Sequence, residues 1–148
     1  MVEGKLVNGH TDMAGEIGYL PIGPGPLQAF ASTTALLEQA SQAYGAPLTG
    51  ETFFELIRAG QHPALEALLE QFLEHLATGL LSIIYLLNPE VIVIGGGILA
   101  QQDLLLPRLD QTLRRLVVDE RFLTARIQAA HLGNDAGMIG ALYQLIRS

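Results

Sequence analysis

Cysteine is absent from the 148-residue sequence, and only 16% of the residues are charged. The lack of cysteine excludes disulfide bonds, thiol nucleophiles and zinc sites built on thiolate ligands. Basic residues are also few, because 8 Lys and Arg stand against 15 Asp and Glu and give a formal net charge of −7. Since nucleic-acid phosphates are bound by clustered basic side chains, we expect no nucleic-acid partner for this segment.

Long uninterrupted apolar runs are missing too, although 49% of the residues are hydrophobic. The most apolar run, residues 80–87, is interrupted by Ser82 and Tyr85 and is much shorter than the roughly 20 residues of a membrane-spanning helix. Glu3 and Lys5 occupy positions where a signal peptide would need apolar residues. We therefore expect a cytoplasmic protein with no membrane partner, and one domain over residues 1–148.

The spacing of apolar residues predicts an α/β fold. Over residues 63–87 they recur three and four positions apart, which predicts a long helix with one buried face. Residues 91–94 form a β-branched run that is typical of a strand buried on both faces. Further strands are expected over residues 4–7, 17–22 and 126–130, and further helices over residues 27–44, 49–59 and 104–117. This alternation predicts a largely parallel sheet packed with helices.

Three consecutive glycines, Gly95, Gly96 and Gly97, follow directly after the strand predicted at residues 91–94. Glycine lets a ligand approach the backbone closely because no Cβ intervenes, and ligands of α/β sheets bind beyond the carboxyl ends of the strands. A nucleotide is the natural candidate. A tight turn between a strand and a helix explains the three glycines equally well, and their spacing matches neither a dinucleotide fingerprint nor a P-loop.

Glu16 lies in a glycine-rich segment, residues 9–18, together with Asp12. A carboxylate held between glycines can accept hydrogen bonds from the neighbouring hydroxyl groups of a sugar. Taken alone, Glu16 fits an ordinary acidic residue in a surface loop better than a sugar contact.

Four segments, in the same order, resemble the ROK family of sugar kinases and sugar-responsive regulators. They are Gly15-Glu16-Ile17-Gly18, residues 27–32, residues 88–98 and residues 132–141. The resemblance implies the C-terminal lobe of an actin-like ATPase fold (ribonuclease H-like). It also implies a sugar ligand contacted by Glu16, and a nucleotide whose adenosine side lies near Gly95, Gly96 and Gly97. In the full-length protein the expected cofactor is ATP with Mg.

The sequence departs from the family pattern at several positions of the sugar segment. Tyr19 stands where the family usually has a histidine that serves both the sugar and a zinc ion, and Gln28 stands where a sugar-binding glutamate is usual. Asp12 replaces a usual glycine, and a short Gly/Pro turn takes the place of the cysteine-rich zinc loop. The comparison implies a zinc-free member, in which Glu16, Tyr19 and Gln28 form the sugar contacts.

In the ROK family the phosphate loops and the catalytic aspartate precede the segment that corresponds to residues 4–9. The resemblance therefore implies that this chain carries no catalytic residue and is inactive alone. Three functions stay open: half of an ATP-dependent kinase for a hexose or N-acylhexosamine, the effector domain of a sugar-responsive regulator, and a degenerate dimerisation module. We also expect a homodimer, with the apolar second half of the 63–87 helix as a possible contact surface.

Overall fold

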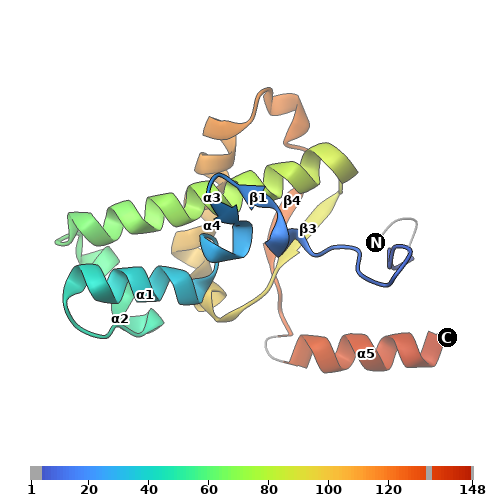
Figure 1. Ribbon diagram of the computed structural model, residues 1–148, viewed down its shortest axis with the longest axis horizontal. Helices are drawn as coiled ribbons and strands as arrows, with labels where there is room; N and C mark the ends of the chain where they lie inside the picture. Colours follow the sequence, from blue (N-terminus) through green and yellow to red (C-terminus); the bar gives the residue numbers. More distant parts are fainter. Residues whose placement is uncertain (1–4, 133–134, 148) are drawn as a thin grey trace.

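A long helix, α3 (Pro63–Leu87), crosses the molecule and carries most of the core. The computed structural model describes residues 5–132 and 135–147, and Figure 1 shows α1 and α2 beside one end of α3, with α4 crossing it. The helices and strands have the following bounds: η1 Ile17–Tyr19, β1 Pro21–Ile22, β2 Gly25–Pro26, η2 Leu27–Ala29, α1 Thr33–Tyr44, α2 Gly50–Ala59, β3 Val91–Ile94, η3 Gly97–Gln101, α4 Gln102–Leu116, η4 Glu120–Phe122, β4 Arg126–Ala129 and α5 Ala136–Arg147.

Local sequence signals set the helix ends. The Ser32 hydroxyl accepts a hydrogen bond from the Ala35 amide at 3.2 Å and caps α1. The prediction of a single helix over residues 27–44 is therefore wrong, because the chain forms η2 first and a separate helix, α1, begins after the Ser32 cap. Thr49 caps α2 in the same way, with its hydroxyl 3.2 Å from the Thr52 amide. Asn88, with φ of 41°, ends α3 just before Pro89.

The core is a single cluster of buried apolar side chains along α3. One face of α3 packs against α1 and α2, and another face packs against α4. Fully buried members include Phe53 and Phe54 from α2, Leu65, Leu69 and Leu73 from α3, and Leu113 from α4. The helix predicted over residues 63–87 is thus confirmed. In its apolar second half Ala77, Leu80 and Ile84 are at most 4% exposed, whereas Leu86 and Leu87 are 78% and 66% exposed. The expectation that this half forms a dimer contact stays a prediction.

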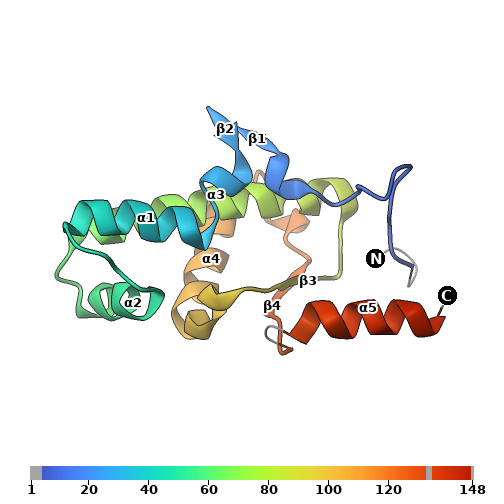
Figure 2. The same cartoon turned by 60° about the horizontal axis from the view of Figure 1, so that its bottom comes forward.

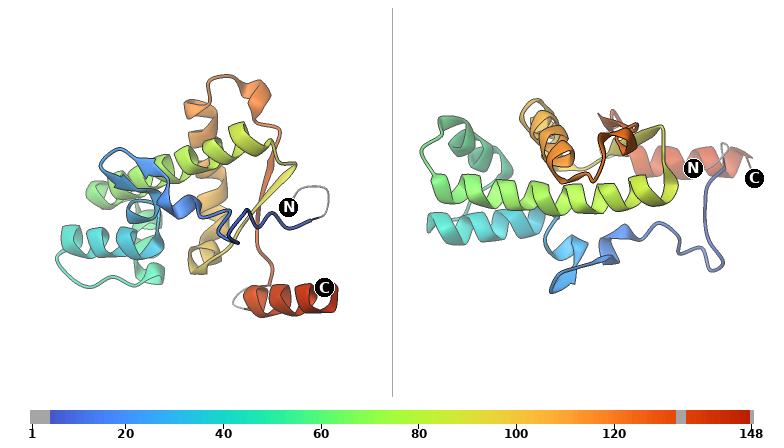
Figure 3. Two further views of the ribbon diagram at one scale, coloured as in Figure 1. Left: turned by 45° about the vertical axis from the view of Figure 1, so that its right-hand side comes forward. Right: turned by 90° about the horizontal axis from the view of Figure 1, so that it is seen from above.

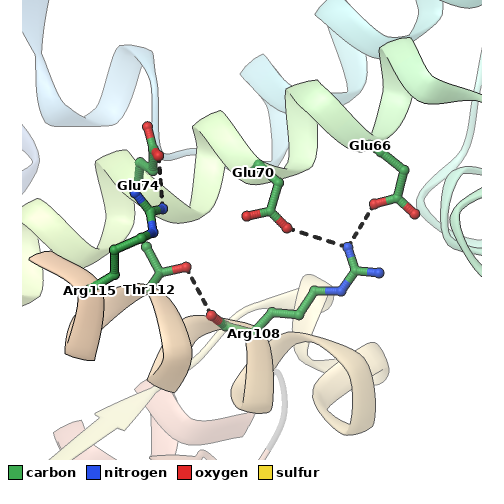
Figure 4. A network of polar contacts seen from close by, with 6 residues as sticks. All are labelled: Glu66, Glu70, Glu74, Arg108, Thr112 and Arg115. Carbon is green, nitrogen blue, oxygen red and sulfur yellow. Dashed lines mark hydrogen bonds and ion pairs between the residues drawn. The ribbon is translucent and has the colours of Figure 1, made fainter.

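A ladder of charges fixes α4 against α3 (Figure 4). The Arg108 Nη1 atom donates to Glu66 Oε2 at 2.7 Å and lies 3.6 Å from Glu70 Oε1, while Arg115 Nη2 lies 2.8 Å from Glu74 Oε1. The hydrogen bond from Arg108 to Glu66 raises the pKa of the arginine above its usual value. Because the glutamates lie one turn apart, the ladder selects one register of α4 along α3.

The described strands form two small sheets. β3 and β4 pair in parallel, and β1 and β2 form an antiparallel hairpin. The strand predicted at residues 91–94 is confirmed, but the expectation that both of its faces are buried is wrong. Ile92 and Ile94 pack against the core, whereas Val93 is 61% exposed on the opposite face, because the helices that pack on this two-stranded sheet cover one side of it.

Two other predicted strands are not formed as expected. Over residues 17–22 the chain makes the 3₁₀ turn η1 and then only the two-residue strand β1, because Gly18 and Pro21 interrupt an extended run. Of the strand expected at residues 4–7, the described part shows one bridging residue, Lys5. The sequence also predicts a last helix that starts at residues 133–135, and residues 133–134 lie outside the described residues.

One described helix, α3, is long and apolar enough to cross a membrane by length and composition. Its most apolar 18-residue window is 44% buried inside the molecule, and the core cluster described above is built along it. A core helix passes the same test of length and composition, so the expectation of no membrane partner stays a prediction.

Candidate functional site

Glu16 and Tyr19 lie on a tight turn. Gly15, with φ of +94°, turns the chain into η1, where the Tyr19 amide donates to the Glu16 carbonyl at 3.1 Å. This left-handed conformation is readily adopted only by glycine, which explains why a glycine precedes Glu16 in the sequence. The side chains of Glu16 and Tyr19 are exposed, the latter by 66%.

Gln28 reaches the same turn from η2. The β1–β2 hairpin returns the chain so that the Leu27 amide donates to the Leu20 carbonyl at 2.8 Å. A Cβ built on Gly18 would lie 3.1 Å from Oε1 of Gln28. The absence of a side chain at residue 18 therefore leaves room for the Gln28 side chain. The structure thus brings Glu16, Tyr19 and Gln28 onto one small exposed unit, which we call the two-turn patch.

The two-turn patch is anchored to α3 by its neighbours. Leu27 is 5% exposed and lies directly against Gly79, where a Cβ would overlap Cδ2 of Leu27. Phe30 contacts His75 on α3 with ring centroids 5.1 Å apart. These contacts flank Gln28 in the sequence and hold its backbone on the core helix, while the side chains of Glu16, Tyr19 and Gln28 stay exposed.

The chemistry of the two-turn patch suits hydroxyl groups. A glutamate carboxylate accepts hydrogen bonds, a tyrosine hydroxyl donates and accepts, and a glutamine amide does both. Together they can bind several neighbouring hydroxyls of a sugar ring from one side.

The three glycines form an open turn after β3. Gly96 has φ of +112° and precedes η3, which continues directly into α4. Among the described residues, a Cβ built on Gly95 would have only Ala130 Cβ within 4 Å, at 3.9 Å, and a Cβ built on Gly96 or Gly97 would have no such neighbour. The turn is exposed and has room for a ligand directly against its backbone.

Arg58 supports the segment after this turn, and no pattern in the sequence indicated it. From the end of α2, Arg58 donates through Nη1 to Gln101 Oε1 at 2.6 Å and through Nη2 to Asp103 Oδ2 at 2.8 Å. The hydrogen bond from Arg58 holds the pKa of Asp103 below its ordinary value of 3.8. The contact joins residues more than 40 positions apart, so no local pattern could have found it.

The two-turn patch and the glycine turn do not meet. Figure 2 and the right panel of Figure 3 place the β1–β2 hairpin on one side of α3, and α4 with the preceding turn on the other. Three of the hollows on the described part of the chain are not lined by any of the six predicted residues. One of these hollows, shallow and about 730 Å³ in volume, lies between α1 and the loop after it and is lined by Leu37, Ser41, Pro47 and Leu48 among others. All six predicted residues are exposed in this chain.

Over residues 5–132 and 135–147, no three His, Asp or Glu side chains are grouped closely enough to hold a metal ion. The implied zinc-free character stays a prediction from the sequence.

Comparison with known proteins gives one consistent result. The model of the ROK family matches residues 1–147. An uncharacterized protein of Clostridium perfringens is 33% identical over 97% of this chain and 49% of its own length. A β-glucoside kinase of Klebsiella pneumoniae is likewise 33% identical, over 97% of this chain and 51% of its own length.

Solved structures agree with this result. A ROK family protein of Streptococcus pneumoniae, in complex with sucrose, superposes with a TM-score of 0.86 at 27% identity, over 97% of this chain and 52% of its own. A ROK family transcriptional regulator matches with a TM-score of 0.65 at 20% identity, over 85% of this chain and 37% of its own, which shows a shared fold alone. The expected fold class, helices packed on a small parallel sheet as in actin-like ATPases, is confirmed. The chain spans about half the length of the curated relatives it matches.

Proposed function

The chain belongs to the ROK family, and from that premise we propose that it forms the C-terminal half of an ATP-dependent sugar kinase. The observation that carries the proposal is the 33% identity to a β-glucoside kinase over 97% of this chain. The α/β fold supports this proposal. So do the two exposed surfaces, since the two-turn patch could form one side of a sugar site and the glycine turn one side of a nucleotide site.

The two-turn patch is the proposed sugar surface. Glu16 would accept hydrogen bonds from two neighbouring hydroxyls, while Tyr19 and Gln28 would supply donors and acceptors beside it. Support comes from the contact between Gly18 and Gln28, which joins the turn that carries Glu16 and Tyr19 to the turn that carries Gln28. We propose a hexose as substrate, free or as a β-glucoside, in preference to an N-acylhexosamine, because the β-glucoside kinases are more similar to this chain than the N-acetylmannosamine kinases.

The glycine turn is the proposed nucleotide surface. Its open backbone fits a ligand that approaches closely, and a ROK family glucokinase of Streptomyces griseus was solved with glucose and AMPPNP. ATP would supply the phosphoryl group, with Mg bound largely through the other half of the kinase. Within this chain, Gly95, Gly96 and Gly97 would shape the nucleotide side.

Phosphoryl transfer would depend on the half of the kinase that this chain does not match. Transfer needs a base at the sugar hydroxyl, a metal ion and phosphate-binding groups held in line. The two-turn patch and the glycine turn lie on opposite sides of α3 and offer single walls, so we expect this chain alone to bind glucose, N-acetylmannosamine and ATP weakly and to be inactive. Sub-micromolar sugar affinity of this chain in calorimetry would contradict the proposed division between two halves.

A sugar-responsive regulator is the alternative. The neighbouring regulator structure is 20% identical and shares the fold, so nothing on this chain favours regulation over catalysis. The residues that precede residue 1 in the two-lobe protein would discriminate: a phosphate loop supports the kinase, and a DNA-binding helical segment supports the regulator. A degenerate module acting through dimer contacts would lack both.

The proposal is tested by substitution of Glu16 in the two-lobe protein. Glu16→Ala should weaken sugar binding by about 2 kcal/mol, roughly 30-fold, because charge-assisted hydrogen bonds are lost. Asp12→Asn is the matched control, since Asp12 lies in the same loop with φ of 57°, a conformation that Asn tolerates. ATP-dependent phosphorylation of glucose and cellobiose would be measured for both variants. Equal sugar affinity of Glu16→Ala and the unsubstituted protein would refute the assignment.

A further inference from the structure

The glycine turn has few contacts that could fix its own conformation. Gly95, Gly96 and Gly97 have no side chains, and glycine has more backbone freedom than any other residue. Among the described residues, a Cβ built on Gly96 or Gly97 would have no neighbour within 4 Å. The path of the turn is therefore set by the segments on either side of it, β3 before it and η3 after it.

The β3 side of the turn is held by the sheet. Ile94 pairs with Ala129 on β4, and the Ala130 amide donates to the Ile94 carbonyl at 2.7 Å. These backbone contacts continue up to the residue before Gly95. The start of the turn is thus fixed by regular secondary structure.

The η3 side of the turn is less firmly packed. No residue of η3 is fully buried, although Ile98 is partly buried against the core. The Leu99 amide donates to the Gly96 carbonyl at 3.1 Å, so a rotation of η3 moves Gly96 with it. A side chain that fixes η3 therefore also fixes the second half of the glycine turn.

Arg58 is such a side chain. It lies in the last turn of α2, beside Ile57, which is 2% exposed in the core. Its Nη1 donates to Gln101 Oε1 at 2.6 Å, and its Nη2 donates to Oδ1 and Oδ2 of Asp103 at 3.1 and 2.8 Å. Gln101 ends η3 and Asp103 lies in the first turn of α4, and Figures 1 and 2 show the end of α2 beside the start of α4. Because the guanidinium is planar and its donors have fixed directions, these contacts fix the orientation of the junction as well as its position.

These contacts are too exposed to contribute much to stability. The side chains of Arg58 and Asp103 are 41% and 70% exposed, and exposed ion pairs stabilise a fold only weakly. The ion pair between Arg115 and Glu74, at 2.8 Å and with side chains 53% and 45% exposed, is similar in kind and joins α3 to the other end of α4. What distinguishes the Arg58 contacts is their position directly after the glycine turn.

On the premise that the glycine turn is the nucleotide surface proposed above, we propose that Arg58 is a positioning residue for the nucleotide. It holds η3 and thereby keeps the glycine turn in the conformation that binds, without touching the ligand. When a binding conformation is populated only in part, the apparent affinity falls by that fraction. The two-turn patch lies on the other side of α3, so the loss of Arg58 should affect ATP and leave the sugar unaffected.

The test measures steady-state kinetics of the two-lobe protein, or calorimetric Kd values where turnover is too slow. Arg58→Gln should raise the KM for ATP about tenfold, and kcat and the KM for glucose should stay within about twofold, because a ground-state nucleotide contact is weakened. Arg115→Gln is the matched control, since it removes the same charge and an ion pair at the other end of α4. It should lower the urea midpoint by a similar small amount and leave the KM for ATP unchanged. An equal rise in this KM in both variants would mean a general loosening of α4 and would overturn the proposal.

Two further substitutions separate positioning from a direct attraction between Arg58 and the nucleotide phosphates. Asp103→Asn removes a negative charge together with an acceptor of the guanidinium. Loss of positioning raises the KM for ATP in this variant, whereas a charge effect lowers it. Arg58→Lys keeps the charge but lacks the planar fork, so it should recover only part of the affinity. A lowered KM for ATP in Asp103→Asn, or an unchanged one in Arg58→Lys, would contradict the positioning role.

Gly97→Ala distinguishes failure of this inference from failure of the proposed nucleotide surface. If Gly97→Ala raises the KM for ATP and Arg58→Gln does not, the turn binds the nucleotide and Arg58 does not position it. If Gly97→Ala has no effect, the nucleotide does not lie on this turn, and both proposals are wrong whatever Arg58→Gln does. In this chain alone, the amide resonances of Gly96 and Gly97 should shift in Arg58→Gln and stay in place in Arg115→Gln. Unshifted glycine resonances in Arg58→Gln would show that Arg58 does not hold the turn.

Discussion

Gly18 faces the side chain of Gln28 so closely that a Cβ at residue 18 would lie 3.1 Å from Oε1 of the glutamine. This contact joins the two 3₁₀ turns that carry the proposed sugar contacts. It also explains why glycine, and no larger residue, follows Ile17 at a position whose backbone conformation does not itself require glycine. The geometry of the two-turn patch thus depends on a missing side chain.

The first prediction concerns this contact. Gly18→Ala should displace the Gln28 amide by a few tenths of an ångström and change the unfolding free energy by less than about 1 kcal/mol, because the exposed side chain can move. The displacement would be followed through the Gln28 side-chain NH₂ resonances. Gly50→Ala is the control, since nothing lies within 4 Å of a Cβ there. Equal Gln28 resonances in Gly18→Ala and Gly50→Ala would show that the contact is absent.

The second prediction concerns the anchor between η2 and α3. Gly79→Ala should destabilise the chain by about 1–2 kcal/mol, because the new methyl group overlaps buried Leu27 and overpacking outweighs the gain in helix propensity. In a Leu27→Ala background the same change should instead stabilise by up to about 1 kcal/mol. Urea unfolding of the four proteins gives the cycle. Additive effects of the two substitutions would contradict direct packing of Leu27 on Gly79.

The helices could be predicted because their signals are local. The bounds of α3 follow from periodic leucines, Pro63 at its start and Asn88-Pro89 at its end. β3 was equally clear from its β-branched run. The burial of β3 was not predictable, because the exposure of Val93 depends on what packs over the strand, and a residue's own sequence neighbourhood does not contain that information.

In the candidate site, too, local features could be predicted from the sequence and contacts between distant residues could not. Residues Glu16, Tyr19 and Gln28 were named from the resemblance to the ROK family, and the turns that carry them lie in contact in the structure. The supports of the site could not be named, because they join distant parts of the chain: Leu27 with Gly79, and Arg58 with Gln101 and Asp103. Such contacts arise from the packing of α2, α3 and α4, and single-sequence patterns do not encode them.

The third prediction follows from the lowered pKa of Asp103. A carboxyl group whose pKa is lower in the folded than in the unfolded protein stabilises the fold above its ordinary value of 3.8, and the contribution disappears as the pH falls through the folded-state pKa. Asp103→Asn should therefore lower the urea midpoint at pH 7, and the difference from the unsubstituted chain should shrink below pH 3.8. Glu55→Gln, at an exposed position on α2, is the control. A difference that stays constant from pH 7 to pH 3 would refute the role of the Arg58 contact.

The fourth prediction separates the structural from the ligand-binding role of the glycine turn. Gly96→Ala should cost about 1–3 kcal/mol of stability, because φ of +112° is strained for any residue with a Cβ. Gly97→Ala should be neutral within about 0.5 kcal/mol, since its Cβ would meet no atom of the described residues within 4 Å and no positive φ is required. If a nucleotide lies against this backbone, the methyl group at residue 97 occupies the ligand's space. In the two-lobe protein Gly97→Ala should then raise the KM for ATP at least tenfold while leaving the KM for sugar unchanged, and Gly50→Ala should change neither. A normal KM for ATP in Gly97→Ala would mean that the three glycines serve only the turn from β3 into η3, which Gly96 alone accounts for.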